Sequence, residues 1–297
     1  MPERGREAIH HTRGGEGEPL LLLHGLGATG AIWEPVVGRL SREREVIAVD
    51  LPGFGRSPAL PGERTPSPVN LAAAMHEFCA RIGVTRPHLA GNSLGGWIAL
   101  EMAKSGQAAS VTTISPAGMW GRPLGPRARD IHRLARALRP ALSLALRWRR
   151  PRNAMLGVTM VRPEHVPAGT GRTLILSWVD SEAYEAANRE MRTEVFDPGG
   201  FPEVPVTLAW AEHDRLVAPP RRAQFPPGAR YLVLPGVGHT PTWDDPGLIA
   251  RVLLEGSSRT RDVAPPLGSR FTDVGPLSGD GQGLEVPPPG RAEEETR

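Results

Sequence analysis

The sequence has one cysteine and one lysine among its 297 residues. Cys79 cannot form an internal disulfide, and it lies in an apolar run typical of a core helix face, so we interpret it as a buried thiol. No window holds the roughly twenty apolar residues that a membrane-spanning helix needs. The charged stretch from Glu3 to Glu7 leaves no apolar run of signal-peptide length. We therefore expect a cytoplasmic protein without an integral membrane segment.

The net charge is also small. The formal net charge is only +3, which is too small to indicate a nucleic-acid partner. Because Lys104 is the only lysine, the pI near 9.7 reflects a general choice of arginine as the cation. The histidines show no metal-ligand spacing with carboxylates or cysteine, so we assign no metal and expect no cofactor. The length suits one sizeable core, or one core with an inserted subdomain.

Short apolar runs alternate with stretches of helical spacing over most of the chain. The runs predict buried strands at 20–23, 46–49, 87–90, 111–114, 204–210 and 231–234. The helical spacing predicts helices at 33–40, 69–82, 94–104 and 248–254. Strands and helices joined by short turns are typical of a mostly parallel sheet that helices cover on both faces. We therefore predict an α/β fold with a mostly parallel central sheet.

The alternation stops between residues 119 and 200. Helical spacing returns at 127–150, interrupted at Pro140, and at 181–192. An insertion after a central strand predicts a helical cap over the carboxyl edge of the sheet, where such sheets bind ligands. We assign 1–118 and 201–256 to the core and 119–200 to the cap. Residues 257–297 are rich in proline, glycine and charge, which predicts a disordered tail outside the fold.

The predicted cap is strongly basic. Residues 119–172 contain twelve arginines and two acidic residues, Asp130 and Glu164, a formal charge of +10. A solvated helix face is the ordinary interpretation of such a run. The alternatives are that the arginines attract an anionic substrate or an acidic membrane surface. The sequence leaves these three interpretations open.

One segment has the pattern of a catalytic turn. Residues 91–96 read GNSLGG and lie between a predicted strand and a predicted helix, the context of a G-x-S-x-G nucleophile elbow. Such a turn strains the serine backbone, and Gly91 and Gly95 relieve the crowding around it. The Ser93 hydroxyl then lies at a helix N-terminus, where N–H groups favour negative charge. We predict Ser93 as a nucleophile.

Four further motifs accompany the elbow in order along the chain. They read HGLG at 24–27, DLPGFGRS at 50–57, AEHDRLV at 211–217 and GHTP at 238–241. With them, residues 20–254 resemble the α/β-hydrolase superfamily. The resemblance implies a catalytic triad of Ser93, Asp214 and His239. It also implies an oxyanion hole built from the backbone N–H groups of Leu26 and Leu94.

The acid of the triad has rivals nearby. A serine hydroxyl needs a histidine to accept its proton, and the histidine needs a carboxylate that holds its tautomer. Asp214 occupies the family's position for that carboxylate. Asp244 and Asp245 precede a helix, so we interpret both as a helix cap or a first-turn dipole partner. Glu212 is a further rival, and we interpret Asp50, at a strand end, as a loop-tethering hydrogen bonder.

The residue types at the predicted site indicate acyl transfer. Serine in place of aspartate argues against the haloalkane dehalogenase and epoxide hydrolase branches, which form an ester on an aspartate. We therefore predict hydrolysis of a small carboxylic ester or thioester through an acyl-serine intermediate. The apolar acyl or aryl part of that substrate has candidate contacts in the cap, although packing also explains each of them. They are Trp120, Met119, Met155 and Trp178.

Two other functions stay open. The segments 91–96, 115–118 and 213–215 also resemble carbon–carbon bond hydrolases of aromatic ring-fission products, although Thr240 stands where that branch commonly has an aromatic residue. A small-molecule receptor or another non-hydrolytic member of the same fold is the second alternative, because fold does not dictate function. The sequence does not indicate an oligomeric state.

Overall fold

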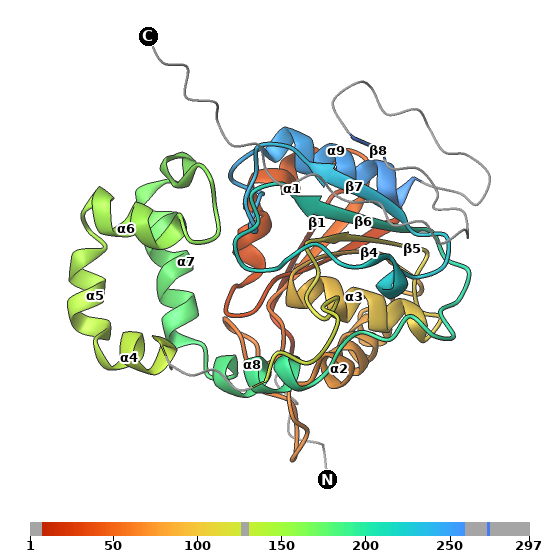
Figure 1. Ribbon diagram of the computed structural model, residues 1–297, viewed down its shortest axis with the longest axis horizontal. Coiled ribbons are helices and arrows are strands. Elements are labelled where there is room, and N and C mark those ends of the chain that lie inside the picture. The colour runs from red at the N-terminus through yellow and green to blue at the C-terminus, as the bar shows by residue number, and fades with distance from the viewer. Residues whose placement is uncertain (1–7, 126–130, 259–271, 274–297) are drawn as a thin grey trace.

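The computed structural model describes residues 8–125, 131–258 and 272–273 (Figure 1). The described strands form one sheet in the order β1-β3-β2-β4-β5-β6-β7-β8. Neighbouring strands are parallel from β3 to β7, and only β1 and β8 run antiparallel to their neighbours. The strands are β1 (His11–Gly14), β2 (Pro19–Leu23), β3 (Glu45–Val49), β4 (His88–Asn92), β5 (Ser110–Ile114), β6 (Val206–Ala211), β7 (Arg230–Leu234) and β8 (Thr272–Asp273). The predicted mostly parallel sheet is confirmed.

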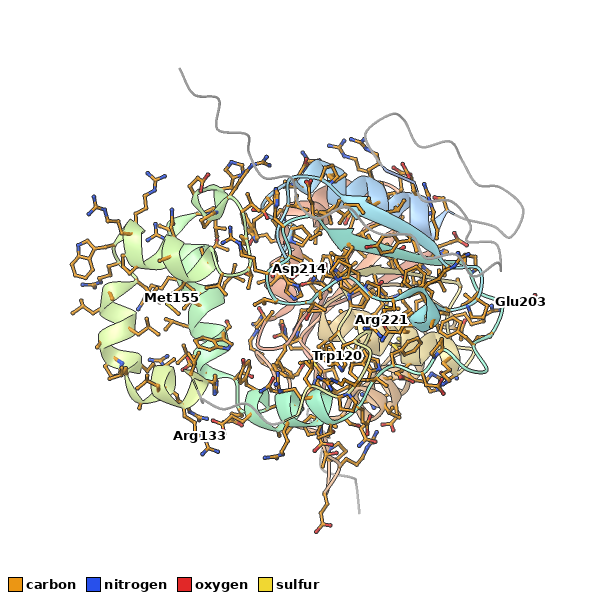
Figure 2. All side chains as sticks on the ribbon, viewed as in Figure 1. Trp120, Arg133, Met155, Glu203, Asp214 and Arg221 are labelled. Atoms are coloured by element: carbon orange, nitrogen blue, oxygen red, sulfur yellow. The ribbon has the colours of Figure 1, made fainter. Side chains whose placement is uncertain are left out.

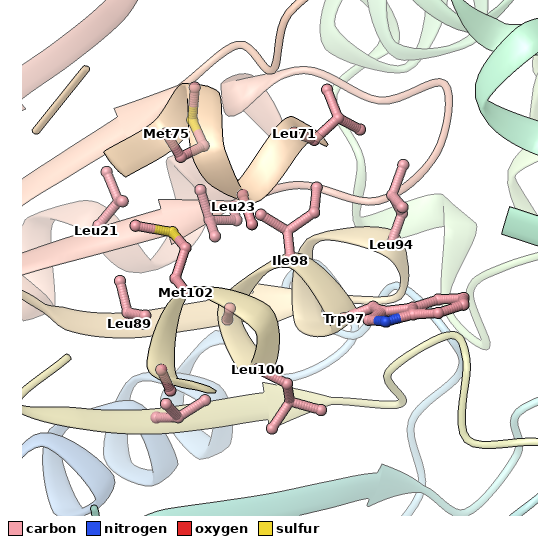
Figure 3. Packing of buried hydrophobic residues seen from close by; sticks show 14 of the residues in the cluster. Leu21, Leu23, Leu71, Met75, Leu89, Leu94, Trp97, Ile98, Leu100 and Met102 are labelled. Carbon is pink, nitrogen blue, oxygen red and sulfur yellow. The ribbon is translucent and has the colours of Figure 1, made fainter. Parts of the chain in front are cut away.

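Helices cover both faces of the sheet. Those of the core are α1 (Glu34–Leu40), α2 (Pro68–Arg81), α3 (Leu94–Lys104) and α9 (Pro246–Ser257), with short 3-10 turns at Gly30–Trp33 and Arg222–Gln224. Side chains alternate between the faces along β2: Leu21 and Leu23 pack with α2 and α3, whereas Leu20 and Leu22 pack with α1 and α9. Figure 3 shows the first of these clusters, with Met75 and Ile98 beside the two leucines. This two-sided burial explains why the strands are continuously apolar.

Local capping residues start two of the core helices. The Ser67 side chain accepts a hydrogen bond from the Asn70 N–H at 3.2 Å, and Pro68 follows it at the first helical position of α2. The Asp245 carboxylate accepts one from the Leu248 N–H at 2.8 Å at the start of α9. The expected cap role of Asp245 is confirmed.

The insertion between β5 and β6 is helical. It contains α4 (Ile131–Ala137), α5 (Arg139–Ala145), α6 (Arg149–Leu156), the 3-10 turn Pro163–His165, α7 (Ala168–Asp180) and α8 (Tyr184–Thr193). In Figure 1, α4, α5 and α6 lie on the side of α7 away from the sheet. The predicted break at Pro140 falls instead at Leu138, because Pro140 lies in the first turn of α5, where its missing N–H is tolerated. The glycines at the start of α7 hid that helix from sequence analysis, and burial of Leu174 and Val179 stabilises it.

The C-terminal prediction is wrong in part. Ser257 is the last residue of α9, and Thr272–Asp273 pair with Leu232 and Val233 of β7 as the edge strand β8. A sheet edge offers unpaired backbone groups that a segment can bind whatever its side chains, so apolar content does not predict this pairing. The other residues of the predicted tail, 259–271 and 274–297, lie outside the described residues.

None of the helices in the described part of the chain combines the length and the apolar composition that crossing a bilayer requires.

The backbones of β2, β4 and α3 approach one another closely. A Cβ atom added at Gly91 would lie 2.1 Å from the Gly95 carbonyl oxygen, and one added at Gly95 would lie 2.2 Å from the Leu23 carbonyl oxygen. Real Cβ atoms do not come so near to backbone oxygens. Glycine is therefore required at both positions for β4 to pass directly into α3 beside β2.

We expect Gly91→Ala to lower the free energy of unfolding by about 3 kcal/mol or lose the fold, because the clash involves rigid backbone. Gly38→Ala is the matched control, since nothing lies within 4 Å of the Cβ it would add to the helix α1. That control should gain about 0.5 to 1 kcal/mol. Urea denaturation of both variants measures the difference, and equal stabilities would contradict the close approach.

Candidate active site

Ser93 forms the turn between β4 and α3. Its φ and ψ angles are 54° and −118°, a conformation that residues with a side chain rarely adopt. The Ser93 N–H donates to the Ile114 carbonyl at 3.0 Å, and the Ser93 carbonyl accepts from the Ala117 N–H at 2.9 Å. The end of β5 and the backbone that follows it thus hold the strained residue in place.

The two predicted oxyanion residues both belong to segments that border Ser93. Leu94 follows it as the first residue of α3. The HGLG loop runs directly against the serine, because a Cβ added at Gly25 would lie 3.2 Å from the Ser93 Cβ. Leu26 is the next residue of that loop. Leu26 and Leu94 thus lie in the two segments that adjoin Ser93.

Asp214 and His239 form a buried pair. The His239 Nδ1 lies 2.7 Å from the Asp214 Oδ2, and the two side chains are only 6% and 2% exposed. Burial by itself would raise the pKa of Asp214. The hydrogen bond and charge of His239, with N–H donation from Val217 and Leu216, outweigh burial and lower that pKa. An ionised Asp214 keeps the proton of neutral His239 on Nδ1, which leaves Nε2 as an acceptor.

Asn92 connects this pair to the elbow. Its Nδ2 donates to the His239 carbonyl at 2.8 Å and to the Ile114 carbonyl at 3.0 Å, and the residue is buried. The base loop is thereby held against the residue that precedes Ser93. Sequence analysis missed this role of Asn92, although an amide in an otherwise apolar strand is an informative signal, because a buried amide needs partners.

Asp244 holds the base loop from the other side, and its predicted role as a helix cap or dipole partner is wrong. Its side chain is buried and accepts hydrogen bonds from the N–H groups of Gly238 at 2.8 Å, Arg162 at 2.6 Å and Val161 at 3.0 Å. The last two donors come from the helical insertion, and no local pattern around Asp244 reveals them. This carboxylate joins the insertion to the residue preceding His239.

The remaining rival carboxylates have structural partners. Glu212 accepts from the Gly236 N–H at 2.7 Å and is exposed. Asp50 accepts from the N–H groups of Gly30 and Arg56 at 2.8 and 2.9 Å, so its expected tethering role is confirmed. Among the described residues, no three of the His, Cys, Asp and Glu side chains are grouped so as to hold a metal ion.

The four candidate substrate contacts lie in different surroundings. Trp178 packs against the oxyanion loop, since a Cβ added at Gly27 would lie 2.5 Å from its Cδ1. Trp120 packs edge to face on Trp97 with a centroid distance of 5.8 Å. Met119 is buried in the core, and Met155 is partly buried among the cap helices (Figure 2). The structure therefore brings Trp178 to the oxyanion loop, whereas packing accounts for the two methionines.

His24 ties the oxyanion loop to the loop after β3. It is fully buried, its Nδ1 donates to the Gly25 carbonyl at 2.8 Å, and its Nε2 accepts from the Leu51 N–H at 2.9 Å. Burial lowers the pKa of His24 to about 4, although the Gly25 carbonyl and the Asp50 charge act in the opposite direction. The neutral ring is required, because a protonated Nε2 could not accept from Leu51.

Comparison with known proteins agrees with this architecture. Residues 20–252 match the model of the alpha/beta hydrolase family, so the chain belongs to that family. Its relatives and structural neighbours include esterases and an epoxide hydrolase, and the chain is a hydrolase of this fold.

Individual relatives differ in their named activities. The chain is 31% identical to epoxide hydrolase EphH of Mycobacterium tuberculosis over 58% of this chain and 86% of that protein. It is 46% identical to the pimeloyl-[acyl-carrier protein] methyl ester esterase of Aeromonas hydrophila, over 31% of this chain and 35% of the esterase. The chain thus spans about a third of that esterase's length. A crystal structure of a membrane phospholipase A superposes with a TM-score of 0.64 at 28% identity, covering 85% of this chain and 84% of the other.

The histidine of the oxyanion loop predicts a pH dependence of stability. Between pH 6.5 and about 4 the unfolded chain binds a proton at His24 that the folded protein excludes. The free energy of unfolding should therefore fall as the pH drops through this window, by about 3 kcal/mol from His24, with the full contribution present above pH 6.5. His24→Gln retains a donor and an acceptor without titrating. Urea unfolding at several pH values should show a smaller loss in the variant, and an equal loss would contradict this role.

The clamp at Asp244 predicts a contrast between neighbouring residues. Asp244→Asn places an N–H₂ group opposite backbone N–H donors, so we expect a loss of about 3 kcal/mol in the free energy of unfolding. Asp245→Asn should change it by less than about 0.5 kcal/mol, because asparagine caps helices as well as aspartate does. Thermal and urea unfolding measure both. If Asp245→Asn cost more than Asp244→Asn, the clamp would be refuted.

Proposed function

We propose that the protein hydrolyses a small carboxylic ester or thioester through an acyl-serine intermediate, with Ser93 as nucleophile, His239 as base and Asp214 as the orienting acid. The observation that carries the proposal is the 2.7 Å contact between His239 Nδ1 and Asp214 Oδ2. Asn92, which donates to the His239 carbonyl, joins that pair to the strained serine.

The reaction follows from these roles. His239 accepts the Ser93 proton at Nε2 while the Ser93 oxygen attacks the substrate carbonyl carbon. The N–H groups of Leu26 and Leu94 donate to the carbonyl oxygen as it becomes negative. Collapse of this intermediate expels the alcohol or thiol, which takes the proton from His239. A water molecule then gives a proton to His239 and attacks the acyl-serine carbonyl carbon. When this second intermediate collapses, the bond to Ser93 breaks, the Ser93 oxygen takes the proton from His239, and the acid is released.

We take residues 119–200 as a cap over this site and Trp178 as its principal substrate contact. An indole beside the oxyanion loop would face the acyl or leaving group of a bound ester, which favours substrates with an apolar acyl or aryl part. The methyl ester esterase activity of one relative supports this class. The epoxide hydrolase activity of another is less consistent with the chain, because serine stands at its elbow instead of the aspartate that such chemistry requires.

A fluorophosphonate probe and a nitrophenyl acetate assay test the proposal together. We expect Ser93→Ala to abolish labelling and to lower turnover by about 10⁴-fold or more, because the nucleophile is lost while the packing is unchanged. Ser105→Ala is the control, since that hydroxyl only bonds the Met102 carbonyl at the end of α3. It should label and turn over like the parent.

Other results would redirect the assignment. Turnover by pure Ser93→Ala within about tenfold of the parent would refute the nucleophile. Tight binding of aryl esters without turnover or labelling would favour the receptor alternative. Cleavage of a ring-fission product faster than any ester would favour carbon–carbon bond hydrolysis.

A further inference from the structure

The outer part of the cap has an unusual composition. Residues 131–163, which include α4, α5 and α6, contain eight arginines and no aspartate, glutamate or lysine. Two of these arginines are neutralised from the inner helices, where Asp180 pairs with Arg139 and Glu185 pairs with Arg133. The others leave this layer of the cap positively charged.

Three of these arginines form one exposed group. Arg147, Arg149 and Arg150 lie between α5 and α6 and at the start of α6. Among the described residues, no carboxylate forms an ion pair with any of the three. Trp148 lies within the group and is 60% exposed. Trp148 thus has an arginine on each side of it in the sequence.

Large apolar side chains are exposed in the same layer. Of the eleven large hydrophobic residues that are exposed in the described chain, seven lie between residues 131 and 161. They are Ile131, Leu134, Leu138, Leu144, Trp148, Val158 and Val161. Single exposed apolar residues are ordinary on soluble proteins, but concentration in about a tenth of the chain marks a surface for binding.

The exposed leucines, Trp148 and the three arginines lie within residues 134–150, which run from α4 through α5 to the start of α6. The buried residues of the layer, such as Leu146 and Leu156, belong to the apolar cluster that also contains Leu174 and Ile175 of α7. In Figure 1, α4, α5 and α6 lie beyond α7 as seen from the sheet. The exposed leucines, Trp148 and the arginine group therefore form what we call the outer cap surface, which no described part of the core covers.

We propose that the outer cap surface binds peripherally to an anionic lipid bilayer. Leucine, isoleucine and tryptophan side chains enter the boundary between headgroups and acyl chains, while arginines pair with lipid phosphates. A second copy of the chain would bring like charges together. A nucleic acid would use the arginines but leave the exposed leucines in water. The bilayer satisfies both kinds of side chain, and the proposal does not depend on the ester chemistry.

Vesicle sedimentation with the full chain tests this proposal. We expect binding to vesicles of phosphatidylcholine mixed with phosphatidylglycerol and little binding to phosphatidylcholine alone. The triple variant Arg147→Gln, Arg149→Gln, Arg150→Gln should bind about a hundredfold more weakly. Trp148→Ser should also weaken binding, although it leaves the charge unchanged.

The matched control removes the same charge from the core. Arg39, Arg42 and Arg81 are exposed on α1, after α1 and at the end of α2, and changing all three to glutamine should leave vesicle binding as in the parent. Thermal unfolding and nitrophenyl acetate hydrolysis show whether each variant is folded.

Three outcomes would overturn the proposal. Equal losses in the two triple variants would mean that net charge alone attracts the vesicles. Binding of heparin or RNA as tight as vesicle binding, and unaffected by Trp148→Ser, would indicate a polyanion site. Absence of vesicle binding together with self-association that Trp148→Ser abolishes would make the surface an interface between copies of this chain.

Discussion

The direct passage of β4 into α3 is the constraint on which the rest of the site depends. It requires backbone to pack on backbone: Gly91 meets the Gly95 carbonyl, and Gly95 meets the end of β2. Because β2 ends there, the loop that follows it is forced against Ser93, and Leu26 comes with it. The strained φ angle of Ser93 is maintained by hydrogen bonds with the end of β5 and the segment after it. A single crowded turn thus brings together a hydroxyl, a helix N-terminus and a second loop of N–H groups.

Buried polar side chains position the loops that regular structure leaves undefined. Asn92 donates to the His239 carbonyl, and Asp244 accepts from the N–H of Gly238. The backbone at His239 and at the residue before it is therefore fixed by two buried side chains. His24 does the same for the oxyanion loop. Each of these groups is satisfied by backbone partners, which makes its burial tolerable and its loss costly. The arrangement of Ser93, His239 and Asp214 therefore depends on residues outside the proposed triad.

The helical insertion between β5 and β6 has two chemically different sides. Its inner side fits closely on the core, with Trp178 against Gly27 and the Ala183 Cβ where a side chain at Gly53 would lie. Asp244 adds a hydrogen-bonded connection to the base loop at the other end of the insertion. The outer layer carries arginines and exposed aliphatic residues instead. One insertion thus contacts both the HGLG loop and the loop of His239 on its inner side.

Local pattern by itself determined the parallel strands β2 to β7, the helix from Leu94 to Lys104 and the order of the five motifs, because alternation, capping and glycine turns act within a few residues. It also indicated a basic helical insertion. Tertiary structure alone separated Asp244 from Asp245: both precede the same helix, but one accepts hydrogen bonds from Val161, 83 residues away in sequence. The partners of Asn92, the helix α7 and the edge strand β8 likewise depend on distant segments. A sequence pattern reports what a residue prefers locally, whereas a buried polar group or a sheet edge takes whichever partner the fold brings to it.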